Sequence, residues 1–178
     1  MKYSILEDMF EGESPKSVLE VGCANGGLLK DLAETFPGLK VGGMEISQDL
    51  KGAKELFPDQ ADNFIQHDIT DPWPFEDKSY DIVFSCGVLM YIFEPVGVVK
   101  EMLRVGKKVV IAEHHNDQLS ANGALGEAFT DQKSCGTGIV RNYYEVFQKI
   151  GGPLYIKARL SNGKTIFTLC QQKNEQLG

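Results

Sequence analysis

Short apolar runs alternate along this chain with segments that have helical spacing. The apolar runs predict strands over residues 17–21, 39–44, 63–66, 80–85 and 107–112. Apolar positions three and four apart predict helices over residues 28–36, 48–56, 96–104 and 142–150. Strands that alternate with helices are typical of an α/β fold with a mostly parallel sheet.

The C-terminal pattern is different, because two apolar runs follow each other without a helix between them. Residues 154–160 and 165–170 are separated by Ser161, Asn162, Gly163 and Lys164. Asn-Gly between two apolar runs is a strong hairpin signal, so we expect an antiparallel hairpin at the end of the sheet. Residues 116–138 have little periodicity and predict a loop, with one helical turn around 125–129.

These patterns predict a single domain over residues 17–173, with a short N-terminal segment (1–16) before it and a frayed tail (174–178) after it. The 178 residues suffice for one core of ordinary size. No apolar run reaches the roughly 20 residues of a membrane span, and residues 1–10 lack a signal-peptide core. We therefore expect a cytoplasmic protein without a membrane partner.

The charge and the cysteine content limit the classes of partner and cofactor that we expect. The formal net charge is -7, and the 18 Lys and Arg residues are scattered along the chain. Phosphate contacts usually need a basic stripe, so a nucleic-acid partner is disfavoured and a small-molecule partner favoured. The four cysteines form no CxxC pair, so we expect neither a disulfide framework nor a bound metal.

A glycine-rich loop follows the first predicted strand. The segment 20–27 (EVGCANGG) lies between a strand and a helix. Small residues in this place let the backbone approach a ligand closely, and the helix offers free N–H groups. An ordinary tight turn would have a similar composition, so the loop alone leaves both interpretations open.

Acidic residues end the next two strands. Glu45 ends the second, where a carboxylate can accept hydrogen bonds from both hydroxyls of a ribose. Asp68 follows the third, where it can accept one from an adenine amino group, and Ile46 and Ile69 can form apolar walls. A solvated strand-end acid and a turn-forming aspartate are the alternatives. Because ligands bind at the carboxyl ends of parallel strands, the combination with the glycine loop favours a nucleotide-like ligand.

The order of LEVGCANG, GMEIS, Asp68 and YDIVFSCGVLMYI resembles the class I S-adenosylmethionine-dependent methyltransferases. The resemblance covers about residues 17–173 and implies a Rossmann-like fold. That fold has a seven-stranded, mostly parallel sheet, an antiparallel C-terminal hairpin and helices on both faces. It also implies S-adenosylmethionine as the cofactor and methyl transfer as the activity. The cofactor-binding residues that it implies are Glu20, Gly22, Cys23, Ala24, Asn25, Glu45, Ile46, Asp68, Ile69, Ser85 and Cys86.

A narrower resemblance concerns residues 84–92 and 101–115. These segments are similar to methylases of sialic-acid-like sugar biosynthesis, which implies a sugar or related metabolite as acceptor. Those methylases commonly carry histidine where this chain has Tyr91, so the likeness does not fix a specific substrate.

The acceptor side has weaker candidates. A base is needed only when the acceptor must lose a proton, and His114 and His115 follow the fifth strand, where one could act. A pair of ordinary loop histidines is the alternative. Tyr91, Arg141 and Tyr144 are candidates for lining the acceptor pocket. That pocket is expected to be shallow, or completed by residues 3–10 or by a second subunit of a homodimer.

Two other functions compete with methyl transfer. Gly22, Ala24 and Gly27 also resemble the fingerprint of a nicotinamide-dependent oxidoreductase, although the hairpin does not fit a second mononucleotide half. The lack of a compelling base also leaves open a non-catalytic module that binds S-adenosylmethionine. Stronger binding of NADH than of S-adenosylhomocysteine would favour the first alternative.

Overall fold

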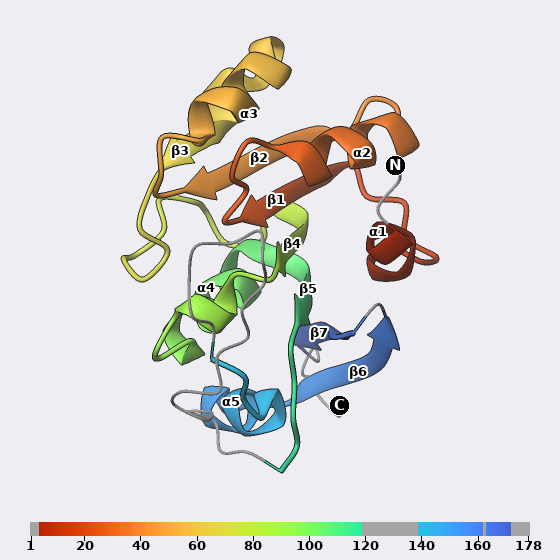
Figure 1. The fold of residues 1–178 in the computed structure, drawn as a ribbon, viewed down its shortest axis with the longest axis vertical. Helices are drawn as coiled ribbons and strands as arrows, with labels where there is room; N and C mark the ends of the chain where they lie inside the picture. The colour runs from red at the N-terminus through yellow and green to blue at the C-terminus, as the bar shows by residue number, and fades with distance from the viewer. Residues whose placement is uncertain (1–3, 119–138, 162, 172–178) are drawn as a thin grey trace, which may run out of the picture.

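The structure is a computed structural model that describes residues 4–118, 139–161 and 163–171 (Figure 1). Strands and helices alternate through its first two thirds, and two strands end it. In chain order the elements are α1 (Ser4–Met9), β1 (Ser17–Val21), α2 (Gly27–Thr35), β2 (Lys40–Glu45), α3 (Leu50–Leu56), η1 (Pro58–Asn63), β3 (Phe64–Gln66), β4 (Tyr80–Cys86), η2 (Leu89–Tyr91), α4 (Val96–Val105), β5 (Gly106–Glu113), α5 (Tyr143–Ile150), β6 (Leu154–Ser161) and β7 (Lys164–Gln171), where η marks a 3₁₀ helix.

The strands form one seven-stranded sheet in the order β3-β2-β1-β4-β5-β7-β6. The first five strands pair in parallel, so their carboxyl ends share one edge. β7 pairs antiparallel with β6, as the Asn-Gly signal predicted, and it also pairs antiparallel with β5. The predicted fold class, a mostly parallel sheet with a reversed C-terminal hairpin, is therefore confirmed.

Helices cover both faces of the sheet (Figure 1). On one face, buried side chains of α1, α2 and α3 pack against inward-facing residues such as Val18 and Phe84. On the other face, α4 and α5 pack over residues such as Leu19 and Val83. Neighbouring residues of a strand point to opposite faces, so each continuous apolar run contributes buried side chains to both faces of the sheet.

Two glycines inside β2 are explained by their close neighbours. A Cβ on Gly42 would lie 2.8 Å from the Tyr80 hydroxyl, and one on Gly43 would lie 2.4 Å from Cys23 Sγ. Glycine usually weakens a strand. Here it lets the side chains of Tyr80 and Cys23 pack directly against β2.

Several boundaries differ from the sequence prediction. The helix predicted over 48–56 begins at Leu50, and α1, η1 and η2 were not predicted. These three elements have six residues or fewer, too short for a clear period. α1 nevertheless buries Ile5, Leu6 and Met9. The helical turn expected around 125–129 lies outside the described residues, as do Cys135 and most of the loop 116–138.

Candidate functional site

A cavity of about 920 Å³ opens at the carboxyl edge of the sheet. It is close to the upper end of the roughly 300–1,000 Å³ typical of ligand pockets. Its lining comes from the residues that follow β1, β2, β3, β4 and β5, and from the start of β7. The lining residues are Gly22, Ala24, Glu45, Ile46, His67, Asp68, Ile69, Thr70, Cys86, Gly87, Val88, Met90, Tyr91, Ile92, His114 and Lys164.

The cavity has two ends, which we name by the strands that supply them. The β1–β3 end holds six of the residues that the sequence assigned to cofactor binding: Gly22, Ala24, Glu45, Ile46, Asp68 and Ile69. The β5–β7 end holds Cys86, Gly87, His114 and Lys164. Between them, the loop after β4 contributes a mostly apolar wall: Val88, Met90, Tyr91 and Ile92.

The glycine loop folds tightly at the β1–β3 end. Gly22 has a φ of 70°, and its N–H donates to the carbonyl of Met44 at 2.8 Å. A Cβ at Gly22 would lie only 2.6 Å from Val88 Cγ2. Ala24 also has a positive φ, 44°. A left-handed conformation next to a neighbouring side chain explains why glycine stands at position 22.

Glu45 connects the end of β2 to this loop. One carboxylate oxygen accepts from the Ala24 N–H at 3.0 Å, and the other accepts from the Ser47 N–H at 2.9 Å. An ionised carboxylate has about four acceptor positions, so two of them stay available for a ligand. The geometry suits a pair of neighbouring hydroxyls.

Asp68 and two isoleucines complete this end. Asp68 accepts from the Thr70 N–H at 2.9 Å and from the Thr70 hydroxyl at 2.7 Å. These two hydrogen bonds lower the pKa of Asp68, so it stays ionised and acts as an acceptor. Ile69 is buried, whereas Ile46 is 62% exposed and forms an apolar rim. Trp73 packs in the core and donates to the carbonyl of Ile69, outside the cavity lining.

Glu20 is a buried acid on β1, just before the glycine loop. Its side chain is 3% exposed, and its Oε2 has no hydrogen-bond partner among the described residues. Burial, and then the charge of Glu45, raise the pKa of Glu20 to about 8. A cationic group placed beside it would favour the ionised form.

The β5–β7 end contains a thiol, an imidazole and an ammonium group. Burial raises the pKa of Cys86 to about 12, so this thiol is protonated at neutral pH and is a poor nucleophile. His114 follows β5 and lines the cavity. Among the residues that line this cavity, Lys164 is the one with an ammonium group.

Glu113, the last residue of β5, lies fully buried beneath this end. One of its carboxylate oxygens accepts from the N–H groups of Val88 at 2.7 Å and Leu89 at 2.8 Å. Burial raises the pKa of Glu113, while those N–H groups and the charge of Lys164 act in the opposite direction. Glu113 therefore fixes the start of η2, which forms the wall of the cavity.

Three predicted acceptor-side residues do not line the cavity. Arg141 is fully buried and donates to the carbonyls of Ile92 at 2.7 Å and Phe93 at 3.1 Å. His115 accepts from the Tyr143 N–H at 3.2 Å, and Tyr144 packs edge-on against its ring. Successive residues of an extended chain point in opposite directions, which separates His114 from His115. A direct acceptor contact by Arg141, His115 or Tyr144 stays a prediction.

Four predicted cofactor residues, Glu20 among them, also lie outside the lining. Cys23 is buried against β2, and Asn25 is exposed beside Gly52 of α3. Ser85 is fully buried, and its hydroxyl has no partner among the described residues. Their assignment to the cofactor, like that of Glu20, stays a prediction.

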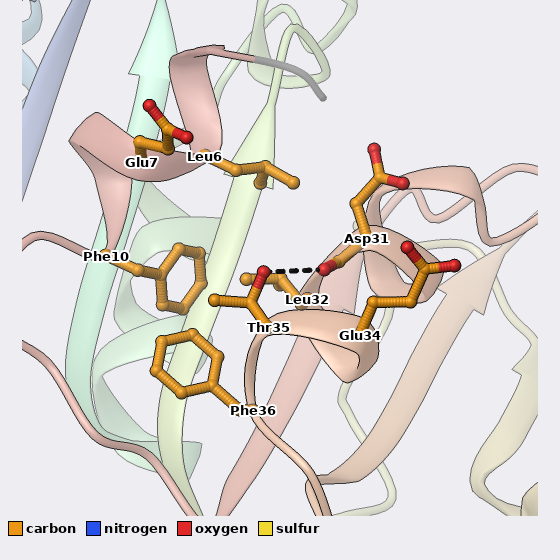
Figure 2. A pocket seen from close by; sticks show the side chains of 8 residues that line it. All are labelled: Leu6, Glu7, Phe10, Asp31, Leu32, Glu34, Thr35 and Phe36. Atoms are coloured by element: carbon orange, nitrogen blue, oxygen red, sulfur yellow. Dashed lines mark hydrogen bonds between the residues drawn. The ribbon is translucent and has the colours of Figure 1, made fainter. Parts of the chain in front are cut away.

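A second cavity, of about 270 Å³, lies between α1 and α2 (Figure 2). Phe10, Leu32 and Phe36 give it apolar walls, and acidic side chains lie around its margin. The Thr35 hydroxyl donates to the carbonyl of Asp31 at 2.9 Å. No residue predicted individually for catalysis or for cofactor or acceptor binding lines this cavity, although part of the segment 3–10 does. The larger one is therefore the candidate functional site.

Sequence reasoning missed several residues of the large cavity. His67 and Thr70 flank Asp68, and Gly87 and Lys164 meet at the other end. Glu113 could have been found, because it is an acid at the carboxyl end of a strand, just as Glu45 is. Lys164 carried no such signal, since it reads as part of a hairpin turn.

Neither a metal centre nor a membrane-spanning helix is found in the described part of the chain. In residues 4–118, 139–161 and 163–171, no group of three or more His, Cys, Asp or Glu side chains could hold a metal ion. Within the same ranges, no helix has both the length and the apolar character needed to cross a membrane. Cys23, Cys86 and Cys170 are free thiols.

Comparison with known sequences identifies a family. The profile of the Methyltransferase domain family matches residues 19–111, about half of the chain. The 2-methyl-6-phytyl-1,4-hydroquinone methyltransferase of Synechocystis sp. is 36% identical over 92 residues, 51% of this chain and 29% of that protein. The tRNA U34 carboxymethyltransferase of Nautilia profundicola is 30% identical over 120 residues, 62% of this chain and 38% of that protein. The chain thus spans less than two fifths of the length of these curated relatives.

Solved structures share the whole fold at low identity. Streptomyces venezuelae DesVI superposes with a TM-score of 0.73 and 17% identity, covering 96% of this chain and 91% of that one. Haemonchus contortus phosphoethanolamine N-methyltransferase 2, in complex with S-adenosylhomocysteine, gives a TM-score of 0.68 and 18% identity, covering 96% and 52%. With the family match, the sheet order and the strand-end site, this chain belongs to the class I S-adenosylmethionine-dependent methyltransferases.

Proposed function

We propose that this chain binds S-adenosylmethionine in the large cavity and transfers its methyl group to a small molecule. The observation that carries the proposal is the convergence of Gly22, Glu45, Asp68 and Ile69 on one end of that cavity. These residues follow three different strands, and each supplies a group that a nucleoside needs. An ordinary turn or a solvated acid would not require that convergence.

The residues present fit the adenosine part of this cofactor. Glu45 has two acceptor positions left for the ribose hydroxyls, after its bonds to Ala24 and Ser47. Asp68 would accept from the adenine amino group, and Ile46 and Ile69 would contact the faces of the base. Gly22 would let the loop backbone approach the ligand without a clash.

Glu20 fits the amino-acid part of the cofactor. Its buried carboxyl has an unpaired oxygen among the described residues, and a nearby ammonium group would lower its raised pKa. When bound, S-adenosylmethionine supplies an activated methyl group on a sulfonium. The residues of this chain would then mainly orient the acceptor and exclude water, a role that needs no nucleophile from the protein.

Features of the β5–β7 end support a small-molecule acceptor. The mostly apolar wall formed by the loop after β4 lies beside this end, and Lys164 supplies an ammonium group there. A net charge of -7 with scattered basic residues does not favour a polynucleotide. The relative that acts on tRNA makes that substrate the strongest competitor, so it belongs in the test.

The first experiment separates binding from transfer. Calorimetry would measure the affinity of the chain for S-adenosylhomocysteine and for NADH. Radiolabelled methyl transfer from S-adenosylmethionine would then be followed with a panel of sugars, amines, small acids and quinols, and with bulk tRNA. We expect S-adenosylhomocysteine to bind more tightly than NADH, and label to enter a small molecule.

Each other result has a distinct meaning. Tighter binding of NADH would replace the cofactor assignment by a nicotinamide. Transfer to tRNA alone would keep the cofactor and overturn the acceptor class. Tight binding of S-adenosylhomocysteine without transfer to any acceptor would favour a non-catalytic binding module.

A further inference from the structure

Lys164 reaches the cavity because β7 runs antiparallel to the strands beside it. Glu113, at the end of β5, pairs with Thr165, so Lys164 extends past the end of β5 beside His114. The amino end of β7 therefore lies at the edge where the parallel strands have their carboxyl ends. Hairpin pairing of Lys164 with Ser161 holds its backbone there.

The side chain of Lys164 extends over the loop after β4. Gly87 has a φ of 70°, and a Cβ at that position would lie 3.0 Å from Lys164 Nζ. The missing side chain of Gly87 thus leaves space for the ammonium group. Cys86 and His114 line the same end of the cavity.

The ammonium group has no direct anionic partner within the described part of the chain. No hydrogen bond or ion pair joins Lys164 Nζ to a carboxylate there, although Glu113 lies close enough for Lys164 to affect its pKa. Glu113 accepts at Oε1 from the N–H groups of Val88 and Leu89, while its buried Oε2 has no hydrogen-bond partner among the described residues. At the opposite end, Glu45 and Asp68 both accept hydrogen bonds from the protein.

We propose that Lys164 is a specificity-determining residue that recognises an anionic group, a carboxylate or a phosphate, on the acceptor. This inference rests on the proposed function, since it presumes that the β1–β3 end holds the cofactor. An ammonium group with three donors and a mostly apolar wall beside it suit a small molecule with an acidic group on an apolar body. Charge-assisted hydrogen bonds of this kind are about twice as strong as neutral ones.

The experiment compares matched probes on matched variants. Calorimetry would measure binding of 4-hydroxybenzoate, of its neutral analogue 4-hydroxybenzamide and of phenyl phosphate, each with and without saturating S-adenosylhomocysteine. The variants are Lys164→Gln and Lys164→Arg, with Lys54→Gln on the exposed face of α3 as control. Thermal unfolding of each variant would verify that it is folded.

We expect the wild type to bind at least one anionic probe about tenfold more tightly than the amide. Lys164→Gln should abolish that preference, Lys164→Arg should retain most of it, and Lys54→Gln should leave it unchanged. Comparing 4-hydroxybenzoate with phenyl phosphate would show which anion is preferred.

Three results would overturn the inference. The first is a wild type without any preference for an anion, and the second is a preference that persists in Lys164→Gln. The third is a loss of S-adenosylhomocysteine affinity in Lys164→Gln that is as large as its loss of affinity for the anionic probe. That result would assign the ammonium group to the cofactor instead. If the wild type itself fails to bind S-adenosylhomocysteine, the proposed function fails, and the anion preference is still measured on the free chain.

Discussion

The two ends of the large cavity are built from the same sheet edge in different ways. At the β1–β3 end, β2 finishes with Glu45 and Asp68 follows β3, and Glu45 joins the end of β2 to the loop after β1 through the Ala24 N–H. At the β5–β7 end, a parallel strand meets a reversed one, and Lys164 comes from the start of β7 rather than from the end of a strand. Buried Glu113 lies beneath this end and holds the wall formed by η2.

The β1–β3 end is built from local features of the sequence, whereas the β5–β7 end depends on contacts between residues far apart in the chain. Each feature of the β1–β3 end lies within a few residues of its own strand, so short sequence motifs describe it. The β5–β7 end requires Gly87, His114 and Lys164 to be brought together by the antiparallel pairing of β7. A family-wide cofactor suits the first construction, whereas an acceptor that varies among relatives suits the second.

The largest effect is expected at Glu113, which supports the β5–β7 end. Glu113→Ala would leave the buried N–H groups of Val88 and Leu89 unpaired, which should lower the free energy of unfolding by about 2–5 kcal/mol. Glu113→Gln keeps an acceptor oxygen, so its free energy of unfolding should fall clearly less than that of Glu113→Ala. Urea unfolding of the wild type and of the two variants measures both losses of stability. A loss below about 0.5 kcal/mol for Glu113→Ala would mean that this acid does not hold η2.

The next effect concerns Glu20, the buried acid on β1 that precedes the glycine loop. Its pKa is raised from 4.5 to about 8, so the folded chain keeps a proton that the unfolded chain releases between these values. Its contribution to stability is complete below about pH 4.5 and is lost as the pH rises through 8, by at most about 1.4 kcal/mol per unit.

Glu20→Gln removes this titration. Between about pH 5.5 and about pH 7.5, the free energy of unfolding of the wild type should therefore fall by about 2–3 kcal/mol more than that of Glu20→Gln. Urea midpoints at the two pH values test this, and every other titrating group is common to both proteins. Parallel pH profiles would show that Glu20 titrates near its ordinary pKa.

A third prediction addresses binding at the β1–β3 end directly. Glu45→Ala should weaken the affinity for S-adenosylhomocysteine by about 1–3 kcal/mol, or about 5- to 150-fold, because buried hydroxyls would lose their acceptor. Calorimetry measures this change, and Glu76→Ala, at an exposed acid outside the cavity, is the matched control. Unchanged affinity in Glu45→Ala would remove Glu45 from the ribose role.

The smallest effect is expected at Asp68. This acid is exposed and is held by Thr70, so its loss should weaken S-adenosylhomocysteine binding by less than about tenfold in Asp68→Asn. The same titration with Asp62→Asn, at an exposed acid of η1, gives the baseline. A larger loss than that of Glu45→Ala would reverse the relative importance of the two acids.

Much of the fold could be predicted, because periodic apolar runs and the Asn-Gly turn are local signals. The short elements α1, η1 and η2 escaped prediction, since a helix of few residues is stabilised by packing rather than by its own period. At the site, Gly22, Glu45 and Asp68 were found from position alone. The sequence did not distinguish His114, which lines the cavity, from His115, which does not. That difference depends on the direction in which each side chain points.

The sequence by itself determined the mostly parallel sheet, the reversed hairpin and the acids at the ends of β2 and β3, because each depends on neighbouring residues. The tertiary structure alone decided that Lys164 shares a cavity with His114 and Gly87, and that Arg141 holds the segment after η2 from a buried position. The physical reason is strand direction and register. Antiparallel pairing of β7 with β5 carries residues far apart in the chain to one edge, and no local pattern records which ones meet.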